Sequence, residues 1–509
     1  MTRRFSWRAS AAVALAITPL VTADICSTLE AQGIEIERPL AIQYGSELQN
    51  YWSTACGDLR PTCVAYPSSS VEMSAAVKEL HNTDGLFAVK SGGHMPNNGF
   101  ASIQDGLLIS TKRLDQVIYN PDDKTAIIGP GLDWQDAQKG LDDINSGRTL
   151  VGGRMGDVGI GGYMLGGTIY CSKSRQPGGL SFLSSQYGWA ANNVVNYEVV
   201  LANGTVVDAN EKEHTDLFAA LKGGGNNLGI VTSYKLQTHP ISKVWGGNYV
   251  FTADQTPDVL QAVRDFTEYY PDDKAAVIVT ADHTAILKTW IMFLFYDGPE
   301  PPKGVFDNFT ALNPTDTTKM WDSYNDLLKN NNFFVLRGQR YVITTETTPL
   351  PSEDVGAEVM QTLYDTWSNI TNTVIDVPNI IGSMALQPMS RAITEKAKAR
   401  GGDLLNFSPD QDYLIFEFDF SYAVSASDNR IDAATKNLYS GMNNAISDLI
   451  KQGKLPDVYR PLFMNDAYRS QDYWGRIDPQ SRELALKARK AYDPEKFFQT
   501  RTSGGFRLG

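Results

Sequence analysis

Three glycine-rich runs in the first half of the chain constrain its fold more than any other feature. Gly92 and Gly93 precede His94 at the end of a short apolar strand, and residues 159–167 and 222–229 form the other two runs. Glycine lets the backbone approach a ligand closely and adopt positive φ, and consecutive free amides form a nest for phosphate. Because the sequence has only five histidines and one lies in such a loop, His94 is a candidate covalent anchor for a cofactor.

The size and charge of the chain limit the classes of function. At 509 residues the chain is too long for one hydrophobic core, so we expect two or more domains. Its net charge of −13 and the absence of a long basic run argue against nucleic acid and against an anionic membrane as partners. We therefore expect an acidic globular enzyme.

The first residues resemble a secretory signal rather than part of the fold. A basic segment with Arg3, Arg4 and Arg8 precedes the apolar residues 11–20, and small residues at 21–23 form a cleavage site. The apolar stretch is too short for a membrane helix, and no later stretch reaches the roughly 18 apolar residues that one needs. We expect residues 1–23 to be removed and the protein to be secreted, with no membrane span.

Secretion permits disulfides and glycans. The sequence holds four cysteines, Cys26, Cys56, Cys63 and Cys171. Three lie near the mature N-terminus, so we expect one bridge there. Sequence alone does not determine the pairing, and we favour Cys26–Cys63. Glycosylation sequons occur at Asn203, Asn308, Asn369 and Asn406.

The pattern of elements predicts an α+β protein whose two halves differ. Strands at 63–66 and 86–89 and hairpins over 117–127 and 194–208 are short and joined by glycine-rich connections. After about Thr238 the glycine runs stop and longer strands appear. These are expected at 276–280, 286–296, 341–345 and 413–422, with helices at 257–269 and 434–451 between them. This second half is typical of an antiparallel sheet backed by helices, and a helix at 481–491 follows it.

Several motifs in a fixed order connect the chain to a known family. They are Lys90-Ser91-Gly92-Gly93-His94, Gly129-Pro130-Gly131 with Trp134, the second glycine run, Tyr187-Gly188, residues 222–226 and Tyr492-Asp493-Pro494. From about residue 51 to residue 498, the chain resembles secreted fungal flavoprotein oxidases of the vanillyl-alcohol oxidase/PCMH superfamily, in its berberine-bridge-enzyme-like branch. The resemblance implies a two-part PCMH-type FAD-binding domain of small α/β lobes over 24–240. It also implies a substrate domain over 241–455 and a C-terminal segment, 456–509, that returns to the FAD domain.

The same resemblance implies which residues hold FAD. His94 would carry an 8α-histidyl bond to the flavin, and Ser91, Gly92 and Gly93 would cradle the pyrophosphate. Asn465 would lie near the pyrimidine side of the flavin. The remaining expected cofactor contacts are Lys90, Gly153, Val158, Gly159, Gly161, Gly162 and Gly225.

Two positions in the loop before the second glycine run bear on flavin chemistry. Many relatives carry a second covalent link from a cysteine, and Met155 stands at that position here. A thioether cannot form this bond, so the resemblance implies a single link through His94. Val158 falls where a small residue resembles the oxygen-admitting relatives, which favours an oxidase. The alternative for Val158 is a buried strand residue with no role toward oxygen.

One segment departs from the family pattern. Relatives continue directly from the second glycine run into a Ser-x-x-Tyr-Gly segment, whereas residues 168–178 intervene here. The inserted residues are polar and include Cys171. Two interpretations stay open, a solvent-facing loop or an error in the gene model.

The catalytic residues are expected on the strand 413–422. Its alternation places Phe416, Phe418 and neighbouring apolar residues on one face, and Glu417 and Asp419 on the other. A carboxylate beside the flavin could act as a general base. The alternative is a solvated outer face. Tyr468 is a weaker catalytic candidate, and no metal-ligand cluster is expected.

Together these features predict a secreted FAD-dependent oxidase that removes a hydride from a C–OH or C–N carbon of a small molecule and reduces O₂ to H₂O₂. Flavin performs the redox chemistry while the protein orients the substrate and supplies a base. Sugar oxidases of the branch often have two covalent links, so Met155 favours a secondary-metabolite intermediate as substrate. The alternatives are an oxidative cyclase or cycloaddition catalyst of the same fold, a carbohydrate oxidase, and a non-enzymatic interaction protein, against which the intact flavin motifs argue.

Overall fold

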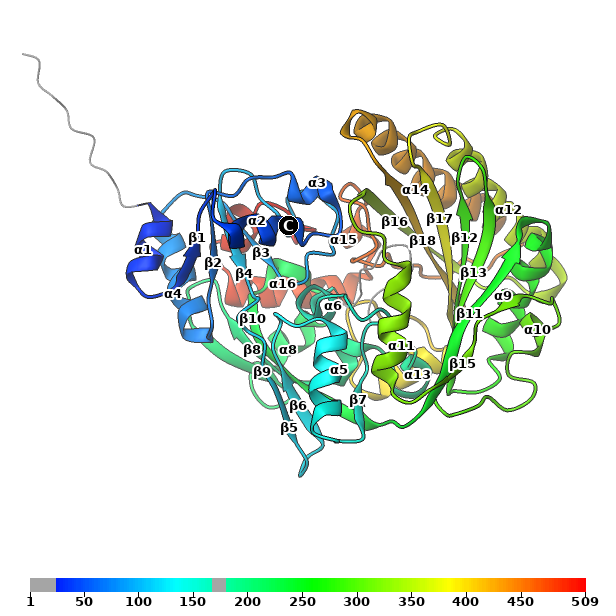
Figure 1. Cartoon of the computed structure of the whole chain (residues 1–509), viewed down its shortest axis with the longest axis horizontal. Coiled ribbons are helices and arrows are strands. Elements are labelled where there is room, and N and C mark those ends of the chain that lie inside the picture. Colours follow the sequence, from blue (N-terminus) through cyan, green and yellow to red (C-terminus); the bar gives the residue numbers. More distant parts are fainter. Residues whose placement is uncertain (1–23, 167–179) are drawn as a thin grey trace, which may run out of the picture.

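The structure is a computed structural model that describes residues 24–166 and 180–509 (Figure 1). The expected signal segment, residues 1–23, and the segment 168–178 lie outside the described residues. Three sheets and their helices make up the described chain, so the α+β prediction is confirmed. Among the described helices, none has both the length and the apolar character that crossing a membrane would require.

The first sheet is small and carries the Gly-Gly-His loop at its end. Its order is β1 (Glu35–Glu37), β2 (Cys63–Tyr66), β4 (Leu107–Ser110) and β3 (Phe87–Lys90). Strands β2 and β3 both pair with β4 in parallel, which requires crossover connections. Helix α4 (Ser70–His81) supplies one of them, and its N-cap Ser69 accepts a hydrogen bond from the Glu72 amide at 3.3 Å.

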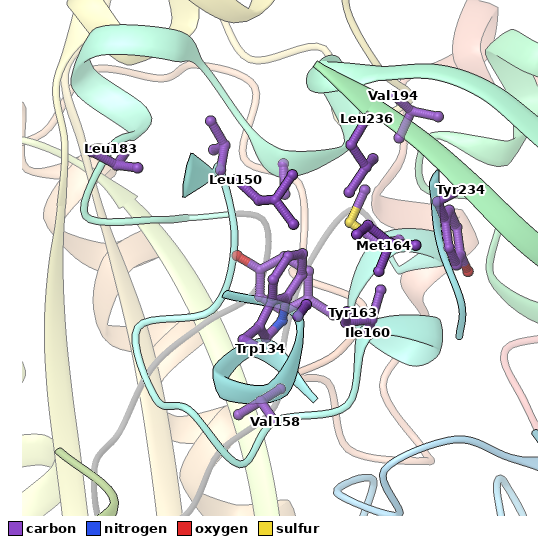
Figure 2. Packing of buried hydrophobic residues seen from close by; sticks show 14 of the residues in the cluster. Trp134, Leu150, Val158, Ile160, Tyr163, Met164, Leu183, Val194, Tyr234 and Leu236 are labelled. Carbon is purple, nitrogen blue, oxygen red and sulfur yellow. The ribbon is translucent and has the colours of Figure 1, made fainter. Parts of the chain in front are cut away.

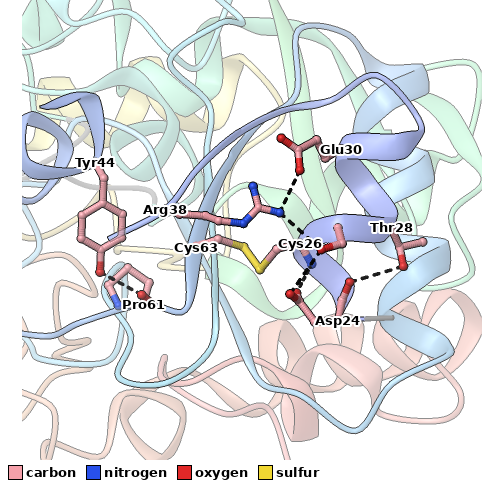
Figure 3. The surroundings of a disulfide bond; sticks show 9 residues. Asp24, Cys26, Thr28, Glu30, Arg38, Tyr44, Pro61 and Cys63 are labelled. Atoms are coloured by element: carbon pink, nitrogen blue, oxygen red, sulfur yellow. Dashed lines mark hydrogen bonds and ion pairs between the residues drawn. A yellow bond between two sulfur atoms is a disulfide. The ribbon is translucent and has the colours of Figure 1, made fainter. Parts of the chain in front are cut away.

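A disulfide ties the N-terminal helix to this sheet. Cys26 in α1 (Ile25–Ala31) bonds to Cys63 in β2 across a sequence separation of 37 residues, as Figure 3 shows. The favoured Cys26–Cys63 pairing is therefore confirmed, and Cys56 is a buried free thiol.

The second sheet is antiparallel and stands beside the first. Its order is β5 (Val117–Asn120), β6 (Thr125–Ile128), β10 (Ile230–Pro240), β8 (Val194–Val200) and β9 (Val206–Asn210), and β7 (Arg148–Leu150) pairs with β10. Both predicted hairpins are present. Helix α5 (Trp134–Asp143) begins after Asp133, because the Asp133 side chain accepts a hydrogen bond from the Asp136 amide at 2.9 Å.

The third sheet forms the other half of the molecule in Figure 1. Its order is β14 (Thr315–Asp316), β11 (Val244–Thr252), β13 (Lys288–Tyr296), β12 (Ala275–His283), β17 (Ile381–Met389), β18 (Tyr413–Tyr422) and β16 (Arg340–Pro349), with β15 (Lys319–Trp321) on β11. One face packs on α9 (Thr256–Tyr269), α12 (Glu353–Asn372) and α14 (Asp428–Lys451) through a large apolar cluster. Sequence reasoning missed β11 and β17, because both contain glycine, which is depleted in strands.

The opposite face of the third sheet packs against the second sheet and its loops. Phe182 stacks on Phe295 of β13 with ring centroids 5.0 Å apart, and Trp52 stacks on Tyr341 of β16 at 4.0 Å. A single apolar cluster therefore runs from the second sheet into the third. Burial of this apolar area holds the two halves together.

The C-terminal segment returns to the first half of the molecule. Helix α16 (Pro479–Tyr492) packs on α8 (Thr215–Leu221), where the Tyr492 hydroxyl donates to Asp216 at 2.7 Å. Helix α17 (Phe497–Arg501) then packs under the first sheet. In Figure 1 this red segment lies among the blue and green elements.

Candidate functional site

The first two glycine runs touch each other through their backbones. A Cβ atom built on Gly92 would lie 2.5 Å from the Gly159 Cα, and one built on Gly159 would meet the Gly92 backbone as closely. Ser91 locks the crossing, because its hydroxyl donates to the Pro130 carbonyl at 2.6 Å and accepts from the Gly161 amide at 3.1 Å. Only glycine at both contact positions allows this arrangement.

A cavity opens beside this crossing. Its volume is about 190 Å³, and most of its lining surface is apolar. The end of β3, α6 (Ile160–Leu165), β10 and the C-terminal segment line it. Of the expected cofactor contacts, those that line it are Ser91, Gly92, Gly93, His94, Val158, Gly159, Gly161, Gly162, Gly225 and Asn465.

Two expected cofactor contacts, Lys90 and Gly153, do not line this cavity. The Lys90 ammonium is buried and pairs with Glu47 at 2.6 Å, and Glu47 also accepts from the Ser110 hydroxyl at 3.1 Å. Gly153 packs against the indole of Trp134, where a side chain would clash. Figure 2 shows Trp134 beside Tyr163, with Val158 nearby in the same apolar cluster. Lys90 and Gly153 thus support the cavity from behind.

His94 lies in the cavity wall with a neutral imidazole, as a covalent link to a cofactor would require. Its ring lines the cavity, is 5% exposed and stacks over Trp52 with centroids 6.2 Å apart. Burial lowers the pKa of His94, and this effect outweighs the opposing one of the nearby Asp157 carboxylate and backbone. A lowered pKa keeps the imidazole neutral at pH 7, which is the form that can bond to an electrophilic carbon.

The cavity fits a phosphate-containing dinucleotide. Gly162 lines it, and a Cβ there would meet no atom of residues 24–166 or 180–509 within 4 Å, which leaves space for a ligand on that side of the described chain. Exposed glycine amides at the start of a helix suit a pyrophosphate. Next to this glycine, the Asn465 amide donates to the Gly162 carbonyl at 3.3 Å and packs on Gly166.

Met155 and Val158 differ in their access to the cavity. Both are buried in the same apolar cluster, but only Val158 lines the cavity within the described chain. Val158 therefore lies where a small side chain can affect access to a bound flavin, as the resemblance implies.

The predicted alternation of β18 is present, but the face that carries Glu417 and Asp419 is not solvated. Their exposures are 1% and 4%, because this face packs against the FAD-binding half. In the register of the sheet, Glu417 lies opposite Ala385 of β17 and Thr345 of β16. The alternative of a solvated outer face is wrong, and both carboxyls lie in a desolvated interface.

A buried arginine lies among these carboxyls. Arg154, from the loop before the second glycine run, is 3% exposed and donates to the Gln387 amide oxygen of β17 at 2.8 Å. Burial lowers the pKa of Arg154 to about 10, although Glu417 and Asp466 oppose this shift. The guanidinium therefore stays cationic at neutral pH.

Sequence reasoning missed Arg154, Gln387 and Asp466. Asp466 follows the predicted Asn465 directly and is completely buried. Its place next to an expected flavin contact was the available signal. Nothing in the pattern marked Arg154, because its partners lie on strands more than 200 residues away.

Tyr468 takes a structural position. Its hydroxyl donates to Asp432 of α14, and Asp432 also binds Arg469 at 2.7 Å and Lys436 at 2.6 Å. This contact fastens the C-terminal segment to α14 and occupies the hydroxyl. Within the described residues, no cluster of three or more His, Cys, Asp or Glu side chains could hold a metal ion.

Comparisons with known proteins agree with this geometry. Residues 61–210 match the family described as FAD binding domain. An FAD-linked oxidoreductase of Arthroderma benhamiae is 46% identical over 487 residues, 95% of each chain. The FAD-dependent monooxygenase prx3 of Penicillium roqueforti is 32% identical over 90% of this chain and 88% of its own. The bifunctional solanapyrone synthase of Alternaria solani is 29% identical over 95% and 88%.

Two solved structures share the fold at low identity. Berberine bridge enzyme from Eschscholzia californica gives a TM-score of 0.73 at 17% identity, covering 96% of this chain and 100% of its own. Carbohydrate oxidase from Microdochium nivale gives 0.73 at 21% identity, covering 95% and 99%. The fold and the glycine-lined cavity thus define an FAD-dependent oxidoreductase with a PCMH-type FAD-binding domain. The chain belongs to the FAD-linked oxidoreductases, as its Arthroderma benhamiae relative shows, and it shares the fold of berberine bridge enzyme.

Replacing Gly162 by alanine tests the cavity as the cofactor site. The new methyl group meets no atom of the described residues, so we expect no loss of apoprotein melting temperature but a lower flavin-to-protein absorbance ratio in the purified protein. Gly45→Ala is the matched control, because Gly45 lies in α2 (Ile42–Gln49) with equally open space. It should keep full flavin content and gain about 0.5–1 kcal/mol of stability. Equal flavin content in both variants would show that FAD binds elsewhere.

Proposed function

We propose that this protein is a secreted FAD-dependent oxidase that takes a hydride from a C–OH or C–N carbon of a small molecule and reduces O₂ to H₂O₂. The observation that carries the proposal is the pair of buried carboxyls, Glu417 and Asp419, on a sheet face packed against the FAD-binding half. An alcohol or amine that loses a hydride must also lose a proton from its oxygen or nitrogen. A buried carboxylate at this interface is a suitable acceptor.

The residues of the chain divide the remaining tasks. Ser91, Gly92 and Gly161 would hold the pyrophosphate, and Asn465 would contact the flavin. When bound, FAD supplies the two-electron oxidation. Arg154 would orient a substrate oxygen or nitrogen, since its guanidinium already binds Gln387 on the same sheet face. Packing of the two halves excludes water from these groups, which strengthens their electrostatic interactions.

The substrate is proposed to be a secondary-metabolite intermediate. The absence of a cysteine at Met155 supports this choice, and so does the similarity to the bifunctional solanapyrone synthase. That relative also supports the second candidate, an oxidative cyclase. Hydroxyl and amide groups of Thr280, Thr345 and Gln387 on the buried sheet face favour a third, a carbohydrate oxidase. A screen of alcohols, amines and sugars for H₂O₂ formation, with product analysis with and without O₂, separates the three.

We further propose one covalent link, from His94. Its neutral, buried imidazole on the cavity wall supports the bond, and Met155 offers no second nucleophile. After acid precipitation we expect flavin to stay in the wild-type pellet. His94→Ala should release flavin into the supernatant and lower activity. His214→Ala, at an exposed histidine far along the chain, should keep flavin in the pellet. Release from the wild type would refute the link, and a flavin-bearing cysteine peptide in a tryptic map would refute its being single.

Val158 is proposed to leave room for O₂ at the flavin. Val158→Leu adds bulk at the cavity wall, so we expect slower reoxidation of the reduced enzyme by air with unchanged reduction by substrate. Met155→Leu is the matched control, because it keeps a similar volume in the same cluster away from the cavity. Stopped-flow absorbance separates the two half-reactions. Slow reoxidation in the wild type would instead indicate a dehydrogenase.

Secretion is supported by the disulfide and by the exposure of all four sequon asparagines, Asn203, Asn308, Asn369 and Asn406. Expressed in yeast with residues 1–23, the protein should appear in the medium, and N-glycosidase should lower its mass. Exchanging the four asparagines for glutamine should abolish that mass change. A chain without residues 1–23 is the control and should stay inside the cells. Retention of the full chain in the cells would contradict secretion.

A further inference from the structure

Asp466 is a buried acid with no task in the fold. It is 0% exposed, and within the described part of the chain neither of its carboxyl oxygens makes a hydrogen bond. A buried polar group without a hydrogen bond is costly, and most such groups in proteins have a partner. Asp466 is therefore a candidate for contact with a ligand.

The C-terminal segment holds Asp466 at the polar face of the third sheet. The Thr347 hydroxyl of β16 donates to the Pro461 carbonyl at 2.6 Å, and the Gln471 amide donates to the Thr345 carbonyl at 2.8 Å. Thr345 lies opposite Glu417 in the register. The segment between Pro461 and Gln471 thus begins and ends beside β16, the strand next to β18, close to the level of Glu417.

The same segment reaches the cofactor cavity. Asn465 precedes Asp466 directly, lines the cavity and donates to the Gly162 carbonyl at 3.3 Å. Asp466 is therefore placed between the predicted flavin site and the carboxyl-bearing strand.

Titratable groups from several elements surround the buried site of Asp466. The groups that face this site are Arg154 from the loop after β7, Glu417 and Asp419 from β18, Tyr163 from α6 and Tyr324 from α11 (Tyr324–Asn331). Desolvation first, and then the Asp419 charge, raise the pKa of Asp466 well above its usual range. A buried acid in such surroundings keeps its proton.

A second unpartnered group lies in the same cluster. The Gln387 amide oxygen accepts from Arg154, while its amide nitrogen is buried and makes no hydrogen bond within the described chain. Since both atoms belong to one amide, this free donor lies at the Arg154 site. Two buried polar groups, the Asp466 carboxyl and the Gln387 amide nitrogen, thus make no hydrogen bond within the described chain.

We propose that Asp466 is a neutral carboxylic acid that donates a hydrogen bond to the oxygen or nitrogen of the substrate. The inference rests on the proposed oxidase function and adds a catalytic residue to it. As the substrate O–H or N–H bond breaks, the proton passes to the ionised carboxylate of Glu417 or Asp419. FAD, when bound, would accept the hydride of the adjacent C–H bond, and a C=O or C=N bond would replace the broken bonds. Asp466 keeps its own proton and stabilises the negative charge that develops on the heteroatom.

Infrared difference spectra of the flavin-loaded enzyme test the proton directly. We expect the C=O band of a protonated carboxylic acid to persist at neutral pH and to disappear in Asp466→Asn. Asp432→Asn is the matched control, since Asp432 binds the same segment through Tyr468 but lies outside the cluster. It should keep the band. Absence of the band from the wild type overturns the proposal without need of any substrate.

Flavin reduction by the substrate found in the screen tests the hydrogen bond. An amide still donates, so Asp466→Asn should react within a few-fold of the wild type and should lose the fall in rate at alkaline pH. Asp466→Ala has no donor and should be slower by roughly 10²-fold. Equal loss in both variants, or an alkaline fall unchanged in Asp466→Asn, overturns the proposal. A screen without any substrate would refute the oxidase function, and the infrared result would still decide the state of Asp466.

Discussion

The cofactor site depends on one backbone contact, the close approach of Gly92 and Gly159. A side chain on either residue would overlap the other's backbone, with a Cβ on Gly92 only 2.5 Å from the Gly159 Cα. The contact brings the Ser91 hydroxyl within reach of both Pro130 and Gly161. It therefore joins three segments from two sheets and leaves bare amides beside the cavity. His94 inherits its position from this crossing, since it follows Gly93 directly.

A second constraint is the apolar contact between the two halves, which removes polar residues of the third sheet from water. Stacking of Phe182 on Phe295 and of Trp52 on Tyr341 belongs to one continuous cluster. The area buried there is the driving force that also desolvates the polar face of the third sheet. Inside such an interface charges interact more strongly than in water. Glu417 and its neighbours are thus buried because of where the two halves meet, and not because of local sequence.

Whether an expected site residue lies at the cavity depends on how local its sequence signal is. The glycine positions line the cavity as expected, because glycine has no side chain and its backbone can approach other groups closely. Lys90 and Gly153 stand behind the wall, since the same motif also needs residues that support the loop. The Tyr468 hydroxyl donates a hydrogen bond to Asp432, which lies on a helix distant in the sequence. Arg154 went unnoticed because its interactions come from strands that only folding brings near.

Sequence by itself determined the local structure and the family. Cap residues such as Asp133, the hairpins, the alternation of β18 and the ordered glycine motifs are short-range features, and each follows from the preferences of a few neighbouring residues. Tertiary structure decided which face of β18 is buried. Alternation indicates that Glu417 and Phe416 point in opposite directions, but burial of the carboxyl face requires a second domain to cover it. The same long-range packing, through loops far apart in the chain, places Arg154 and Asp466 beside Glu417 and so assembles the site.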